Sequence, residues 1–148
     1  MHLKLRACLT KQDTKKSLVR KYIFSFLAIA WTITITILSL IELKGPQVLQ
    51  FSYADKLMHG IIYFSVTVAW FLAFQKGITN EALQKNALTR CALFAFIYGI
   101  AVEIMQETLV TTRQGDWQDA LANTIGIIVA IFTIKWFIAK NRKLKTQN

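Results

Sequence analysis

Seven side chains that can bind ligands or transfer protons lie in three short stretches of a largely apolar chain: Asp55, His59, Glu103, Gln106, Arg113, Asp119 and Asn123. Asp55 precedes His59 by four residues, and Asp119 precedes Asn123 by the same interval. Residues at this spacing share one face of a helix. If these segments are helical, the stretches therefore present their polar groups in pairs.

Three kinds of chemistry fit these residue types. An anionic headgroup would be held by the guanidinium of Arg113 together with neighbouring polar groups. A divalent cation would find suitable oxygen and nitrogen ligands in Asp55, His59, Glu103 and Asp119. Acid and base chemistry would use His59 as the base and Asp55 to orient it, with Glu103 as a further candidate catalytic residue. The sequence contains none of the glycine loops that bind phosphate in nucleotide enzymes.

A purely structural interpretation competes with all three. A network of polar side chains can fix the register of packed helices without binding any ligand. Asp55 could cap a helix, and Lys56 is interpreted as an interfacial lysine whose ammonium group reaches the membrane surface. Glu103 fits this interpretation least well. A charged side chain in mid-membrane costs roughly 2 to 3 kcal/mol on insertion scales unless a partner such as Arg113 or His59 compensates it.

The composition is that of a membrane protein. Of 148 residues, 54% are hydrophobic and 18% are charged, and the formal net charge is +10. The many aromatic residues argue against a disordered chain, and two cysteines, Cys8 and Cys91, are too few for a disulfide framework. Because the basic residues flank apolar blocks and form no stripe along a helix, no nucleic-acid partner is expected.

Four apolar blocks follow one another along the chain, at residues 22–41, 57–74, 87–110 and 121–139. The first block has no formal charge over about 20 residues, enough for a helix to cross a hydrocarbon core of about 30 Å. A helix pairs its backbone polar groups within one segment, as lipid requires, so the predicted fold is all-α, a bundle of four transmembrane helices. The predicted organisation is a basic tail at 1–21, a membrane domain at 22–139 and a second basic tail at 140–148.

The basic residues predict the orientation. Fifteen of the eighteen Lys and Arg residues lie in the N-terminal tail, the segment 76–90 and the stretch from 135 onward. Only Lys44, Lys56 and Arg113 belong to the opposite side. The positive-inside rule then places both termini in the cytoplasm, in a multi-pass protein of the cytoplasmic (inner) membrane. The seven polar residues consequently lie at one depth, near the outer surface.

Small and aromatic residues predict how the helices pack. Ala122, Gly126 and Ala130 recur every four residues, and Ala95 and Gly99 have the same spacing, which is typical of close helix contacts. The aromatic side chains are interpreted as lipid-facing and interfacial groups.

The order and spacing of the polar residues resemble those of the VanZ-like family of small bacterial integral membrane proteins. The resemblance rests on Asp55-Lys56-x-x-His59, on Glu103-x-x-Gln106, and on Arg113-x-x-Asp116-x-x-Asp119-x-x-x-Asn123-x-x-Gly126, and it covers residues 23–137. The chain departs from the family pattern at Gly60, where an aromatic residue often follows the histidine. The family is named for an accessory protein that raises teicoplanin resistance, but the resemblance does not by itself predict a role in resistance for this chain.

These observations favour recognition of a cell-envelope lipid or polar headgroup at the outer face of the membrane. The alternative is a membrane-embedded enzyme that acts on an envelope precursor by acid-base or metal-assisted chemistry. A channel is not favoured, because polar groups at one level give no continuous polar path across the bilayer. The expected partners are the lipid bilayer and an envelope lipid or cell-wall precursor, and the candidate cofactor is a divalent cation.

Overall fold

A computed structural model describes residues 22–41, 52–77, 86–109 and 117–146, and within these ranges the chain is helical and contains no strand. The helices are the N-terminal helix (Tyr22–Leu40), α2 (Ser52–Leu72), α4 (Ala87–Leu109) and α5 (Trp117–Thr146). A π-helical turn, η2 (Ala73–Gly77), extends α2. In the described part of the chain, four helices are long and apolar enough to cross a membrane, which confirms the predicted all-α fold.

Two helices extend beyond the apolar blocks that predicted them. α2 begins at Ser52, before the block at 57–74, and α5 runs past both ends of the block at 121–139. Asp55 and Asp119 consequently lie in the first turns of α2 and α5. A carboxylate is stabilised there by the positive end of the helix dipole, so a polar residue can begin a helix that hydropathy alone would start later.

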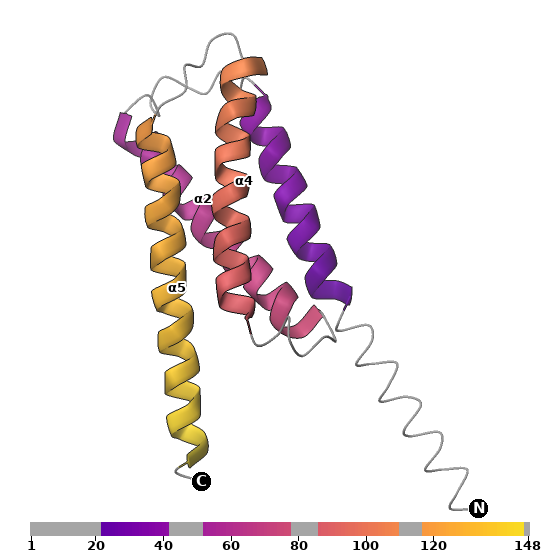
Figure 1. Cartoon of the computed structure of the whole chain (residues 1–148), viewed down its shortest axis with the longest axis vertical. Coiled ribbons are helices and arrows are strands. Elements are labelled where there is room, and N and C mark those ends of the chain that lie inside the picture. Colours follow the sequence, from indigo (N-terminus) through magenta and orange to yellow (C-terminus); the bar gives the residue numbers. More distant parts are fainter. Residues whose placement is uncertain (1–21, 42–51, 78–85, 110–116, 147–148) are drawn as a thin grey trace, which may run out of the picture.

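The helices alternate in direction along the bundle (Figure 1). The start of the N-terminal helix and the end of α5 lie at one end, whereas α2 and α5 begin, and α4 finishes, at the other (Figure 1). α2 crosses the bundle obliquely, and it contacts α5 more extensively than α4. This arrangement brings the polar stretches of α2, α4 and α5 to the same end.

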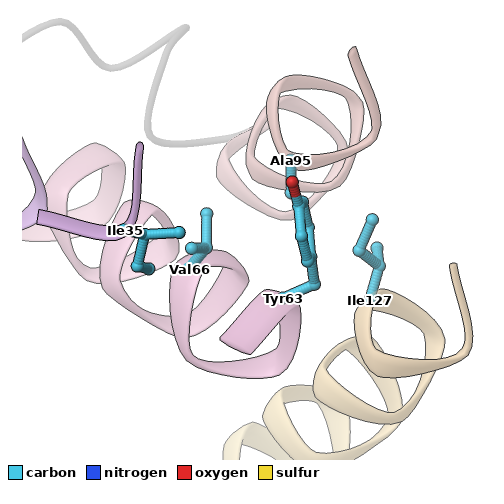
Figure 2. Close-up of a cluster of buried hydrophobic side chains, with 5 residues drawn as sticks. All are labelled: Ile35, Tyr63, Val66, Ala95 and Ile127. Atoms are coloured by element: carbon cyan, nitrogen blue, oxygen red, sulfur yellow. The ribbon is translucent and has the colours of Figure 1, made fainter. Parts of the chain in front are cut away.

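The core forms around α2. Tyr63 of α2 lies between Ala95 of α4 and Ile127 of α5, while Val66 of the same helix faces Ile35 of the N-terminal helix (Figure 2). The interpretation of the aromatic residues as lipid-facing was wrong for Tyr63, which is 2% exposed. The reason is its position on α2, which has protein on several sides.

The small residues lie at helix contacts, as their spacing predicted. A Cβ atom added to Gly126 of α5 would overlap the backbone carbonyl oxygen of Gly60 of α2, so the two backbones touch. A Cβ on Gly99 would lie 3.0 Å from Cε1 of Tyr63. Gly60, the position that departs from the family pattern, thus forms part of the contact between α2 and α5.

Candidate functional site

Five polar side chains from three helices meet at the end of the bundle where α2 and α5 begin. We call them the polar cluster: Lys56, His59, Glu103, Asp119 and Asn123. His59, Asp119 and Asn123 are buried, and Lys56 and Glu103 are partly buried. The structure therefore joins most of the residues that the sequence singled out.

Asn123 lies at the centre of the polar cluster. Its side-chain oxygen is 3.1 Å from Nδ1 of His59, and its Nδ2 donates a hydrogen bond of 3.0 Å to Oε1 of Glu103. Because the amide oxygen can only accept, the histidine donates through Nδ1. One amide thus orients both the imidazole and the carboxylate.

Asp119 faces the other side of the imidazole. Its Oδ2 is 3.7 Å from Nε2 of His59, and its Oδ1 is 3.7 Å from Nζ of Lys56. Both distances exceed the 2.7 to 3.2 Å or so of a hydrogen bond to nitrogen. Oδ1 is buried and accepts no hydrogen bond from any residue that the structure describes. The carboxylate therefore faces an imidazole and an ammonium group, and each of the two lies 3.7 Å from it.

Asp55 lies at the edge of the polar cluster. It is exposed, yet one of its oxygens lies within 4.8 Å of a donor atom of His59 and of one of Asp119. The spacing of four residues from Asp55 to His59 therefore brings the two onto one side of α2. His59 also donates a hydrogen bond through Nδ1 to the side-chain oxygen of Asn123, on a different helix.

Gln106 points away from the polar cluster. Its Nε2 donates a hydrogen bond of 3.0 Å to the backbone oxygen of Ser39, so it joins α4 to the N-terminal helix. Arg113 and Asp116 lie outside the described residues, and an anion contact from Arg113 and its pairing with Glu103 stay predictions. Asn123 is one partner of Glu103 in the structure, and Nδ1 of His59 lies 3.7 Å from Oε1 of the same carboxylate.

Lys56 is the residue of the polar cluster that sequence reasoning assigned to the membrane surface. Its ammonium group lies 3.7 Å from buried Asp119, across the contact between α2 and α5. The signal that could have shown this contact is charge balance, because Lys56 is a basic residue within an acidic stretch of the sequence, next to Asp55. This contact is compatible with a position at the membrane surface, because the Lys56 side chain is still 23% exposed.

A shallow groove between α4 and α5 adjoins the polar cluster. Its volume is about 210 Å³, and Ala95, Phe96, Gly99, Ile100, Ala120, Asn123, Thr124 and Ile127 line it. The lining is mostly apolar, and it includes the small residues Ala95, Gly99 and Ala120. Asn123 belongs both to this groove and to the polar cluster, so the two features are continuous.

The protein is a small bundle of apolar helices with buried polar groups at one end. Residues 9–138, most of the chain, match the model of the VanZ/LLP1 family, and the chain belongs to this family. No curated protein and no solved structure matches it. Its membership and its four spanning helices make it a multi-pass membrane protein that lies in a lipid bilayer.

Proposed function

We propose that this protein binds a cell-envelope lipid, with the headgroup at the polar cluster and part of an acyl chain in the groove between α4 and α5. The observation that carries the proposal is the position of Asn123, which lines the groove and hydrogen bonds within the polar cluster. An apolar groove that ends at buried polar groups matches the two chemical parts of a lipid.

In this proposal an acyl chain of a membrane lipid occupies the groove. α4 and α5 both carry exposed apolar side chains, such as Ile97 and Ile125, which a membrane would cover with acyl chains. The volume of about 210 Å³ lies below the roughly 300 to 1,000 Å³ of sites that enclose a whole small molecule. The groove therefore fits a segment of one acyl chain, and the rest of the lipid lies outside it.

The polar cluster suits a headgroup that donates hydrogen bonds. Glu103 and Asp119 are acceptors when ionised, and Asp119 has an oxygen that accepts no hydrogen bond from the described residues. Hydroxyl and amino groups, such as those of the sugar and amino-acid parts of a cell-wall precursor, would satisfy such acceptors. Arg113, in the stretch before α5, is the proposed contact for a phosphate group.

The proposal places this site at the outer face of the cytoplasmic membrane. The polar cluster lies near the starts of α2 and α5, at the opposite end of the bundle from the start of the N-terminal helix and the end of α5 (Figure 1). The proposal assigns to the opposite side the fifteen of eighteen basic residues that lie in the segments 1–21 and 76–90 and from residue 135 onward. The positive-inside rule makes that side cytoplasmic, with both termini there.

Native mass spectrometry of the gently purified protein tests the proposal. We expect a lipid to remain bound to the wild type and to Ala101→Phe, which adds a ring on the exposed side of α4. Ala120→Phe should lose it, because Ala120 lines the groove and a ring there would fill it. Wild-type protein without bound lipid, or equal retention by both variants, would contradict the proposal.

The alternative function is an enzyme that acts on such a lipid. The hydrogen bond from His59 to Asn123 favours it, because an imidazole held through Nδ1 presents Nε2 for proton transfer. His59→Gln separates the two functions in the same mass spectra. Loss of the lipid indicates recognition, whereas a variant that folds and accumulates more bound lipid than the wild type indicates turnover.

A further inference from the structure

We infer that Asp55, His59 and Asp119 bind a divalent transition-metal ion such as Zn²⁺. One donor atom of each side chain lies within 4.8 Å of the other two. Zn–N and Zn–O bonds of about 2.0 to 2.2 Å separate neighbouring ligand atoms by roughly 3 to 4 Å. Small side-chain movements would therefore bring all three donors to one ion.

The burial of Asp119 is a second, independent observation. The residue is 5% exposed, and its Oδ1 accepts no hydrogen bond from the described part of the chain. The ammonium group of Lys56 lies 3.7 Å from this atom, too far for a hydrogen bond. A buried carboxylate oxygen needs a closer positive group than this, and a metal ion would supply one.

The hydrogen bond to Asn123 prepares His59 as a ligand. Nδ1 faces two acceptors, Oδ1 of Asn123 at 3.1 Å and Oε1 of Glu103 at 3.7 Å, so it carries a hydrogen. In a neutral imidazole the lone pair is then on Nε2, which points toward Oδ2 of Asp119 at 3.7 Å. A lone pair and a carboxylate repel each other unless a cation lies between them. Metal-binding histidines commonly donate their other N–H to an oxygen in this way.

The charges of the site agree with a divalent ion. Among the described residues of the site, Asp55, Glu103 and Asp119 carry three negative charges when ionised, against one positive charge on Lys56. Bringing this excess into a membrane protein is costly, and an ion of charge +2 would neutralise it. The competing account is a protonated His59 that pairs with Asp119 and leaves no place for a metal.

The donor types indicate which ions would bind. One imidazole nitrogen with two carboxylate oxygens suits Zn²⁺ or Mn²⁺, whereas Mg²⁺ and Ca²⁺ prefer sites made of oxygen alone. Three protein ligands also leave a fourth position for water or for an oxygen of a headgroup. The metal site needs no bound lipid, so it can be tested whether or not the proposed lipid recognition is correct.

Calorimetric titration with ZnCl₂ of the full-length protein, first treated with a chelator in a maltoside detergent, tests the inference. We expect one ion per chain, and much weaker binding of MgCl₂. Asp119→Asn and His59→Gln should each weaken Zn²⁺ binding at least about 100-fold, because each removes a direct ligand. Asn123→Ala should weaken it about 10- to 100-fold through the orientation of His59.

Matched variants show whether the ion binds at this site. His2→Gln removes the other histidine of the chain, and Glu107→Gln removes an exposed acid of α4, so both should bind as the wild type does. Lys56→Met keeps all three ligands and removes a cation that competes for Asp119, so it should bind Zn²⁺ at least as tightly. This variant decides the question if the ligand variants fail to fold. Absence of stoichiometric Zn²⁺ binding by the wild type, or weaker binding by Lys56→Met, would overturn the inference.

Discussion

Gly60 of α2 and Gly126 of α5 lie backbone to backbone, and a Cβ atom on Gly126 would overlap the carbonyl oxygen of Gly60. A Cβ on Gly60 would instead meet only the carbonyl oxygen of Ala122, at an ordinary contact distance of 3.5 Å. The contact is thus asymmetric, although both positions are glycine. This asymmetry matters for the site, because Gly60 follows His59 and Gly126 lies one turn beyond Asn123.

Substitution by alanine should therefore change the stability of the protein differently at the two glycines. Gly126→Ala forces α2 and α5 apart, and we expect it to destabilise the detergent-solubilised protein by about 1 to 3 kcal/mol. Gly60→Ala should be neutral or slightly stabilising, because alanine favours a helix over glycine by about 1 kcal/mol. Thermal unfolding of the two variants beside the wild type measures the difference. Equal effects would show that the helices do not touch at these positions.

Asn123 should stabilise the fold through both of its hydrogen bonds. Asn123→Leu leaves the carboxylate of Glu103 and the imidazole of His59 without this partner, at an expected cost of about 2 to 3 kcal/mol in the free energy of unfolding. Glu103→Gln in the same chain should recover part of that cost, because the group left without its partner is then neutral. A double-mutant cycle from thermal unfolding gives the coupling energy. Additive effects would mean that Asn123 and Glu103 do not interact energetically.

The hydrogen bond from Gln106 should stabilise the packing of the N-terminal helix against α4. Its side chain bonds the carbonyl of Ser39, in the last turn of that helix, where backbone carbonyls have no partner within the helix. Gln106→Leu should cost about 1 kcal/mol and speed hydrogen exchange in residues 22–40 more than elsewhere. Thr108→Val is the control, since Thr108 bonds only carbonyls of its own helix. Similar exchange in both variants would argue against this attachment.

The proposed orientation predicts which engineered cysteines an impermeant thiol reagent reaches in intact cells. Cysteines at positions 47 and 114 should be labelled, and those at positions 80 and 145 should not, because the basic segments lie in the cytoplasm. Cys8→Ser suffices as the background, since native Cys91 is 0% exposed. Labelling at position 80 from outside would reverse the orientation.

The sequence alone determined that the chain forms four membrane-spanning helices. Hydropathy and length are properties of one segment at a time, so each span can be recognised without knowing its neighbours. Because successive spans alternate in direction, the sequence also indicated that the stretches around His59, Glu103 and Asp119 share one end of the bundle. The small residues indicated the helix contacts for a similar reason, since spacing by four residues places Gly126 and Ala130 on one face.

Only the tertiary structure decided which polar groups touch. A spacing of four residues shows that Asp119 and Asn123 share a face of α5, but the rotation and crossing of the helices determine what that face meets. That geometry places Asn123 between His59 and Glu103, turns Gln106 toward the N-terminal helix and brings Lys56 to Asp119. The crossing depends on how closely backbones approach at positions such as Gly60 and Gly126, and this close fit is a property of two packed helices together.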